Sequence, residues 1–197
     1  MAYNVPDFKT NDISFGPAVV YMGPYVKAGQ TPTHDVGAIG EDGVTYEIIS
    51  EKKYLSQGNP GTPFMAFTQT NGAKISFTSL EWDFDRFIDS LGAGVTAEDG
   101  PKTGGGAGAN STFKFGGSPS VAALTLRVVH LMNNGNTMDM KIWRCFSDAG
   151  FSINFNQDEH QFAMSFTAGV PEAGATTWDG RALDRASNLV EFQRTTA

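Results

Sequence analysis

The residues that could do chemistry are scattered along this 197-residue chain. Its 3 histidines are His34, His130 and His160, and none stands at a metal-ligand spacing from another histidine or from a cysteine. His34 beside Asp35, and His160 after two acidic residues, resemble acid–base pairs, but ordinary polar positions in a loop and a strand explain both better. His130 shares a strand side with apolar neighbours, which favours a hydrogen-bonded histidine in the core or in an interface.

The cysteine and the glycine run also lack the surroundings that a reactive site needs. Cys145 is the only cysteine, so no internal disulfide can form, and no motif surrounds it. A packed small apolar residue is therefore a better interpretation of Cys145 than a nucleophile. The glycine-rich run at 104–108 lacks the Gly-Lys-Ser/Thr ending of a phosphate-binding loop.

Two acidic sets complete the candidates. The first comprises Glu81, Asp83, Asp85 and Asp89. It matches no metal loop and is typical of a helix cap and a solvated helix face. The second comprises Asp35, Glu41 and Asp42. It flanks glycines in a loop, where a calcium site is conceivable but has no defined spacing. No nucleophile, base and orienting partner come together in the sequence. The sequence therefore predicts no catalytic site, no metal and no cofactor, and a structural role is expected for the chain.

The charge balance restricts the partners. The chain has 14 basic and 21 acidic residues, a net charge of −7. Tight binding of phosphates needs clustered Lys and Arg, so this balance argues against a protein that holds nucleic acid, but not against one that lets it pass. The first residues have no basic and apolar signal-peptide pattern, and no apolar run approaches the roughly 18 residues of a membrane span. We expect a soluble protein made in a cytoplasm, with no membrane partner.

The stretch 73–92 is the strongest structural signal. Apolar residues alternate up to Trp82, which predicts a half-buried strand. They then recur at helical spacing, with Asp83 as N-cap and Gly92 as the stop, which predicts a short amphipathic helix at about 83–91. Such a helix is too short to be stable alone and must pack on a sheet. The packing set is Ile75, Phe77, Trp82, Phe84, Phe87, Ile88 and Leu91.

Around this element the sequence pattern predicts strands and loops. A first strand is expected at 13–22, a long loop at 23–43, and a hairpin at 44–70 with its tip at 54–63. Asn71-Gly72 predicts a tight turn into the next strand, and 93–110 is loop-like.

The second half is predicted to be rich in strands up to about residue 170. In the strand that contains Cys145, strict alternation places two sets of side chains on opposite sides. One set is Met138, Met140, Ile142 and Arg144, and the other is Asp139, Lys141, Trp143 and Cys145. One domain is expected over 1–197, with a β core at 13–170 and polar terminal arms at 1–12 and 171–197.

In this order of elements the sequence resembles the major tail tube proteins of long-tailed bacteriophages. The likeness covers the first half well and the second half mainly by its strand-rich pattern. The segments that carry it are a first strand with Gly16-Pro17, the loop end His34 to Ala38, Gly43-Val44-Thr45, the turn Gln57 to Pro60, and the strand-to-helix element from Ser79 to Gly92.

The resemblance implies a mainly β fold, a β-sandwich or small barrel flanked by one helix, with a long hairpin and extended terminal arms. It implies hexameric rings that stack into a tail tube in the virion, assembled in the host cytoplasm. The implied partners are further copies of the chain, the tape measure protein, the tail tip and tail terminator proteins, and double-stranded DNA that passes through without specific binding. The hairpin residues implied in stacking between rings are Tyr54, Leu55, Gln57, Asn59 and Pro60.

Two other interpretations stay open. The chain could be the tube protein of a contractile tail, a secretion needle or a gene transfer particle. A different class is a β-sandwich that binds carbohydrate, with Trp82, Trp143 or Trp178 as stacking platforms. Packing inside the fold accounts for Trp82 and Trp143, which leaves Trp178 as the exposed candidate.

Overall fold

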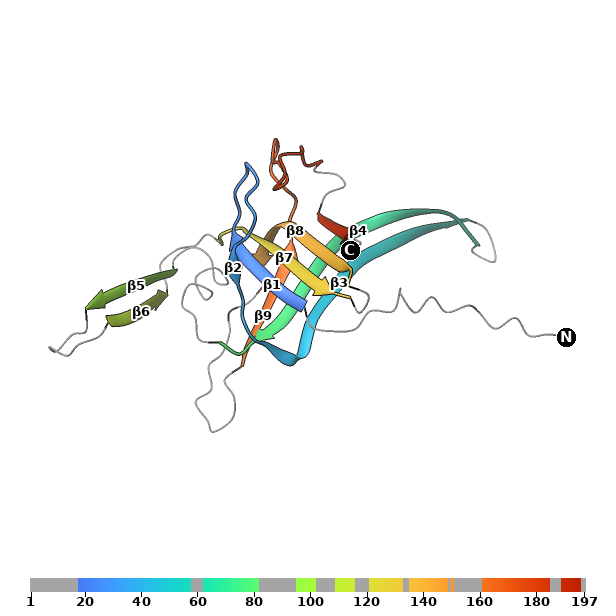
Figure 1. The fold of residues 1–197 in the computed structure, drawn as a ribbon. Coiled ribbons are helices and arrows are strands. Elements are labelled where there is room, and N and C mark those ends of the chain that lie inside the picture. The colour runs from blue at the N-terminus through green and yellow to red at the C-terminus, as the bar shows by residue number, and fades with distance from the viewer. Residues whose placement is uncertain are drawn as a thin grey trace.

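The computed structural model of the chain describes residues 18–57, 62–81, 95–101, 109–115, 121–132, 135–148, 150, 161–184 and 189–195. These residues form antiparallel strands and connections and contain no helix (Figure 1). The mainly β prediction is therefore confirmed. The helix expected at 83–91, with Trp82 and its other apolar residues, and the N-terminal arm 1–12 lie outside the described residues. The strands are β1 (Ala18–Pro24), β2 (His34–Asp35), β3 (Ile39–Gln57), β4 (Thr62–Ser79), β5 (Val95–Pro101), β6 (Ala109–Phe115), β7 (Leu124–Leu131), β8 (Thr137–Ser147), β9 (Phe162–Ala168) and β10 (Val190–Thr195).

Eight of these strands form one sheet in the order β2-β1-β7-β8-β9-β4-β3, and β10 pairs with β8. Strand β8 has β7 along one edge, while its other edge is shared. The first half of β8 pairs with β10 and its last residues pair with β9. Strands β5 and β6 pair with each other in a separate two-stranded sheet.

The two ends of the large sheet are joined by the chain itself. Strand β2 pairs with β1 at one end and β3 pairs with β4 at the other, yet only residues 36–38 separate β2 from β3. The Val36 amide donates to the carbonyl of Val20 on β1 (2.9 Å), and the Leu80 amide donates to the carbonyl of Ala38 (3.0 Å). A flat sheet cannot satisfy both pairings, because adjacent strands are about 4.8 Å apart. The sheet must curl until its ends meet.

The curled sheet encloses one apolar core. Alternate residues of β1, β4, β7 and β9 point into it, as period-2 patterns require. The rings of Phe77 on β4 and Phe166 on β9 are stacked with their centroids 5.9 Å apart. Burial of side chains of this size contributes about 1.5–3 kcal/mol each. The largest fully buried side chains include Phe162, Phe166, Met22, Ile75, Leu124, Leu126 and Ile142.

The predicted sides of β8 are wrong at its end. Cys145 lies in the same buried core as Ile142, not on the opposite side with Trp143. The register explains this. Leu126 pairs with Ile142 and Leu124 pairs with Cys145, so β8 carries one residue more than β7 in this interval. Such a bulge inverts the alternation, which turns Cys145 inward and leaves Arg144 on the other side.

The tight turn predicted at Asn71-Gly72 is also wrong. Both residues lie inside β4, where they pair with Ser50 and Ile49 of β3. A two-residue hairpin turn of the Asn-Gly type needs positive φ at both positions, and Gly72 is not among the described glycines with positive φ. The long β3 offers hydrogen-bond partners along the whole of β4, so the ladder continues through this dipeptide.

Three expected loop or arm segments contain strands instead. The loop at 23–43 holds β2 and the start of β3, and the loop at 93–110 holds β5 and the start of β6. The C-terminal segment 171–197, expected as an arm, contributes β10 to the main sheet. The expected first strand at 13–22 begins at Ala18 within the described residues and extends to Pro24. These strands form because their backbones pair with distant strands. A prediction from the local content of Gly, Pro and polar residues cannot detect such pairing.

Candidate functional site

The hairpin of β3 and β4 extends well beyond the core. Strand β4 pairs with β9 only from Lys74 to Ser79, whereas its pairing with β3 continues out to Thr62. The outer part is therefore a two-stranded ribbon that projects away from the rest of the sheet (Figure 1). Two-stranded ribbons are marginally stable on their own in water. A ribbon of this length gains stability when something packs against it.

One side of the ribbon carries three exposed apolar residues, named here the hairpin patch. They are Leu55, Met65 and Phe67, with 39%, 53% and 42% of their surfaces exposed. Leu55 pairs directly with Met65, and Lys53 pairs with Phe67, so these side chains share one side of the ladder. A patch of apolar side chains on a projecting element is typical of a surface that binds a partner.

A bulge creates this patch. Glu51 pairs with Thr70 and Lys52 pairs with Thr68, so Gln69 is an extra residue in β4. Closer to the core, the odd-numbered residues of β4 point inward, as the buried Ile75 does. The extra residue inverts the alternation and places Met65 and Phe67 on the opposite side of the ribbon. No local pattern in the sequence indicates this bulge, so neither residue was among the predicted contacts.

The other side of the ribbon also carries exposed large side chains. Ile48 is 62% exposed and Tyr54 is 58% exposed. Lys52 is exposed on this side as well, whereas Lys53, which pairs with Phe67, is exposed on the side of the hairpin patch. Of the stacking residues that the resemblance implied, Tyr54, Leu55 and Gln57 lie on the outer part of β3. Asn59 and Pro60 lie outside the described residues.

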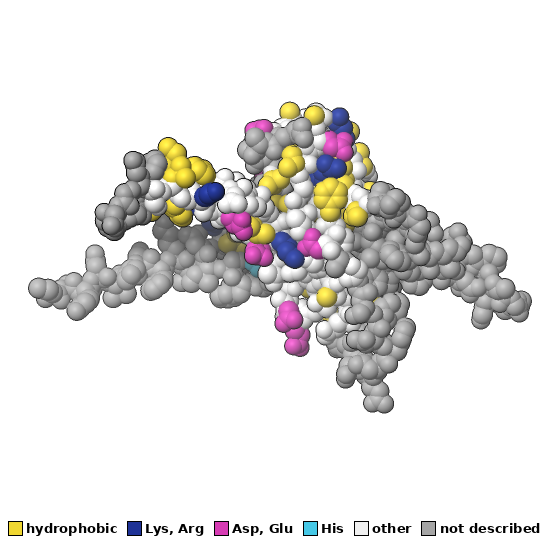
Figure 2. All heavy atoms as spheres, turned by 180° about the vertical axis from the view of Figure 1, so that it is seen from behind, with side chains coloured by type: hydrophobic (Ala, Val, Ile, Leu, Met, Phe, Trp, Pro, Cys, Tyr) yellow, Lys and Arg dark blue, Asp and Glu magenta, His cyan; other side chains and the backbone are white. Residues whose placement is uncertain are grey.

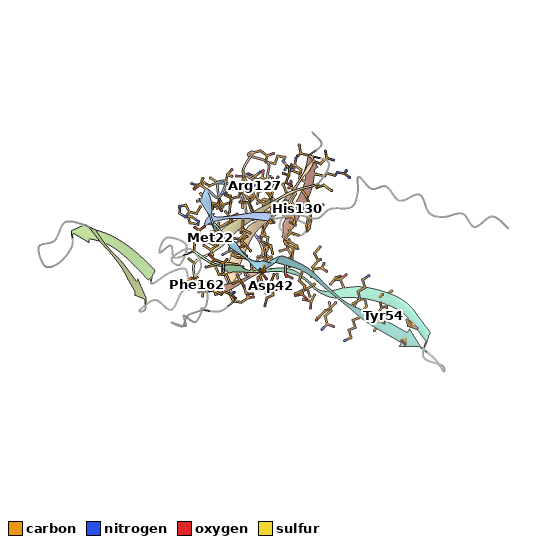
Figure 3. All side chains as sticks on the ribbon, turned by 60° about the horizontal axis from the view of Figure 1, so that its bottom comes forward. Met22, Asp42, Tyr54, Arg127, His130 and Phe162 are labelled. Carbon is orange, nitrogen blue, oxygen red and sulfur yellow. The ribbon has the colours of Figure 1, made fainter. Side chains whose placement is uncertain are left out.

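A hollow lies at the opposite end of the same two strands, and is named here the strand-end hollow. It has a volume of about 730 Å³. Figure 3 shows Asp42 at the core and Tyr54 far out along the hairpin. The side of the sheet turned away from the core supplies hydroxyl groups from Thr45, Ser76 and Ser165. The full lining comprises Asp42, Gly43, Thr45, Ser76, Phe77, Thr78, Gly150, Ala163, Met164 and Ser165.

The junction between β2 and β3 is held by two carboxylates. The Gly37 amide donates to Asp35 Oδ1 (2.8 Å), and the Ala38 amide donates to Glu81 Oε1 (2.8 Å). Gly37 has φ of +79°, which favours glycine, and the carboxylate of Glu81 occupies the space of a Cβ there. Asp35 and Glu81 therefore act on the backbone, and His34 lies beside them, exposed, in β2.

The C-terminal segment lies against β8 through two tryptophans and a set of charges. The Trp143 and Trp178 rings meet edge to face with centroids 4.8 Å apart. Lys141 is buried, with Nζ 2.7 Å from Gln193 and 3.4 Å from Glu191, both on β10. Trp178 is thus a packing residue on the described surface.

Neighbouring charges on β7 and β8 are also paired. Arg127 Nη2 lies 2.8 Å from Asp139 Oδ2, and this hydrogen bond raises the pKa of Arg127 above its ordinary value. On the back of the molecule, basic and acidic side chains lie next to one another (Figure 2). Arg127 and Asp139 thus join β7 to β8, while Lys141 joins β8 to β10.

The remaining predicted candidates stay apart. Cys145 is fully buried, and burial raises the pKa of its thiol, which confirms it as a packed residue. His130 is half-buried near the end of β7, and His160 lies outside the described residues. Among the described residues, no three His, Cys, Asp or Glu side chains gather in a way that could hold a metal ion.

Comparison with known proteins does not assign the chain to a family. A scan against protein families and a search of curated proteins found no match to the chain. Within the described residues, no helix has the length and apolar character to cross a membrane. The hairpin patch and the strand-end hollow are the two surfaces on which a function can be argued.

Proposed function

We propose that this chain is a structural subunit that assembles with copies of itself into a tube, as the major tail tube protein of a long-tailed bacteriophage. The observation that carries the proposal is the hairpin of β3 and β4. Its outer part lies beyond the chain's own core and exposes Leu55, Met65 and Phe67. Burial of apolar surface contributes about 25 cal/mol per Å², so a neighbour that covers this ribbon stabilises both itself and the ribbon.

The unpaired strand edges support the same proposal. Outside its pairing with β9, strand β4 has an open edge from Thr62 to Ala73 within the described residues. Open edges carry free N–H and C=O groups and promote pairing with other chains. A ring of subunits that joins its sheets satisfies these groups and leaves no edge for uncontrolled growth.

The finer parts of the proposal come from the sequence resemblance. The fold is then a β-sandwich or small barrel with a flanking helix at 83–91, and six copies form each ring. The rings stack around the tape measure protein, between the tail tip and the tail terminator. The net charge of −7 fits a conduit for DNA, because a basic bore would bind the phosphates and retard the duplex.

The structure bears differently on the two other interpretations, a tube protein of another particle and a carbohydrate-binding module. Tubes of contractile tails, secretion needles and gene transfer particles would use the hairpin in the same way, so they remain variants of the proposal. A carbohydrate-binding module needs a free aromatic platform. Trp178 packs edge-on against Trp143 and has Lys141 Nζ 5.7 Å from its ring centroid, which makes it a poor platform.

Electron microscopy of the purified full chain at rising concentration, with its elution volume on a sizing column, tests the proposal. Rings or hollow tubes are the expected result. A monomer at every concentration, even after addition of a tail-tip complex as nucleus, would refute it. Binding to glycans by such a monomer would favour the carbohydrate module instead.

A further inference from the structure

We propose that the chain forms an internal isopeptide bond between the side-chain amine of Lys141 on β8 and the side-chain amide of Gln193 on β10. The Lys141 Nζ donates a hydrogen bond of 2.7 Å to Gln193 Oε1, although the two residues lie 52 positions apart in the sequence. The new bond ties the last strand of the main sheet covalently to its neighbour. It lies within one chain, so it forms whether or not copies assemble into a tube.

The register of β8 and β10 brings the two reacting groups together. Lys141 pairs with Glu191 and Asp139 pairs with Gln193, so all four side chains lie on one side of the sheet. Lys141 and Gln193 are diagonal neighbours there, a separation that long side chains can span. Because a C=O bond is about 1.23 Å long, the Gln193 Cδ lies no more than about 3.9 Å from the Lys141 Nζ. A small side-chain rotation reaches the roughly 3–3.5 Å at which attack can begin.

The surroundings of Lys141 keep water away from the reaction. Its side chain is only 10% exposed. Its Nζ lies 5.9 Å from the ring centroid of Trp143 and 5.7 Å from that of Trp178. The two rings shield the amine, so water competes less with it for the amide carbon. Gln193 is exposed at the rim of this cluster, which gives the released ammonia a path to solvent.

The amide of Gln193 is the best electrophile near this amine. Two carboxylates also approach the amine nitrogen, with Glu191 Oε1 at 3.4 Å and Asp139 Oδ2 at 4.0 Å. Each of them has an arginine partner, Arg127 at 2.8 Å from Asp139 and Arg181 at 3.4 Å from Glu191. An ionised carboxylate resists attack by an amine, because its negative charge repels the lone pair of the nitrogen. The neutral amide of Gln193 is both closer and more reactive.

Glu191 is placed to transfer the protons. Its carboxylate accepts one proton from the Lys141 ammonium, and the resulting amine attacks the Gln193 Cδ. A C–N bond forms between Nζ and Cδ, and the bond between Cδ and Nε2 breaks. The leaving nitrogen takes up the proton from Glu191 and the second proton that the attacking nitrogen releases. The products are one isopeptide bond and one ammonium ion, Glu191 regains its charge, and no further reactant is needed.

The folded chain supplies the acceleration that this reaction needs. Exchange between free lysine and glutamine side chains is very slow in water. Well-oriented groups within one molecule react as if each were present at about 10⁵–10⁸ M. The ladder of β10 with β8 fixes both strands, and in the described part of the chain β10 pairs with β8 alone. A covalent bond therefore secures a strand that otherwise depends on one neighbour.

Mass spectrometry of the purified full chain tests the bond directly. The intact protein is expected to weigh one ammonia less than the unmodified chain, and a tryptic digest is expected to contain a branched peptide that joins Lys141 to Gln193. The digest is essential, because succinimide formation at an Asn-Gly pair also releases ammonia. Unbranched peptides alone, after long incubation of the folded protein, would overturn the proposal. A branch from Lys141 to any other residue would overturn it as well.

Substitutions at the two joined residues test the assignment. Lys141→Arg keeps the positive charge and is expected to abolish the branched peptide. Gln193→Glu is expected to block the bond, because the ionised carboxylate resists attack. Lys74→Arg is the matched control, since Lys74 pairs with Asp148 on other strands, and it should leave the bond intact.

The role of Glu191 is tested by the rate of bond formation in newly translated protein. Glu191→Ala is expected to slow the loss of ammonia by roughly a hundredfold, the usual contribution of a positioned acid–base group. Glu191→Asp, which keeps a carboxylate, is expected to recover part of the rate. Equal rates in the unmodified protein and in Glu191→Ala would refute the proton transfer by Glu191.

Discussion

The substitution Gly37→Ala tests the junction that joins the two ends of the sheet. Gly37 has φ of +79°, and a left-handed conformation costs a residue with a Cβ about 1–2 kcal/mol. An added Cβ would also collide with the carboxylate of Glu81, which accepts a hydrogen bond from the Ala38 amide over 2.8 Å. Loss of that hydrogen bond adds about 1 kcal/mol. The expected loss in the free energy of unfolding is about 2–3 kcal/mol.

Gly43→Ala is the matched control. Gly43 has φ of +68°, but a Cβ there would meet no atom within 4 Å. This variant should lose only the conformational term, about 1–2 kcal/mol. Urea denaturation of both variants, followed by circular dichroism, measures the difference.

A double-mutant cycle isolates the contact with Glu81. In a Glu81→Ala background, Gly37→Ala is expected to cost no more than Gly43→Ala does, because the colliding carboxylate is gone. Equal losses for Gly37→Ala and Gly43→Ala in the unmodified background would refute the reasoning. They would mean that Glu81 does not lie over Gly37 in solution.

Three further predictions concern the sheet and its C-terminal cover. Burial tends to raise the pKa of Asp148, but hydrogen bonds, including one with Lys74 (3.0 Å between Nζ and Oδ2), lower it below the ordinary 3.8. A carboxyl with a lowered pKa stabilises the fold above pH about 4, and this effect is lost as pH falls through the lowered pKa. Asp148→Asn should therefore reduce the melting temperature at pH 7 and reduce it less in acid. Trp178→Ala removes the edge contact with Trp143 and should cost about 2 kcal/mol in urea unfolding, with faster proteolysis of the C-terminal segment; unchanged proteolysis would contradict the role of Trp178. The fully buried Cys145 should react with a thiol reagent only after unfolding, and rapid labelling of the native protein would show that its site opens.

The buried side of the core strands could be predicted from the local sequence pattern. Phe162, Met164 and Phe166 alternate with small or polar residues, and all three are buried. Ile75 and Phe77 follow the same rule on β4. The side of a strand on which a residue lies depends only on its number along the strand, so the sequence is sufficient for this. The burial of Cys145 was likewise predicted from the absence of any reactive surroundings.

The β-bulges could not be predicted from the local sequence pattern. An extra residue in β8 turns Cys145 inward, and Gln69 in β4 turns Met65 and Phe67 outward. A bulge is a property of two strands in register, and neither strand signals it alone. The hairpin patch depends on this inversion, so a local reading could name Leu55 but not its neighbours on the patch.

A mainly β chain, an acidic balance and alternating core strands could be predicted from the sequence, because these features follow from residue type and period. Long-range pairing places Asn71-Gly72 within a continuous strand, because β3 provides a ladder partner for both residues. Only the fold brings Thr45, Ser76 and Ser165 from three strands to one hollow. The sequence numbers of these residues are far apart, and hydrogen bonding between distant strands is what places them together.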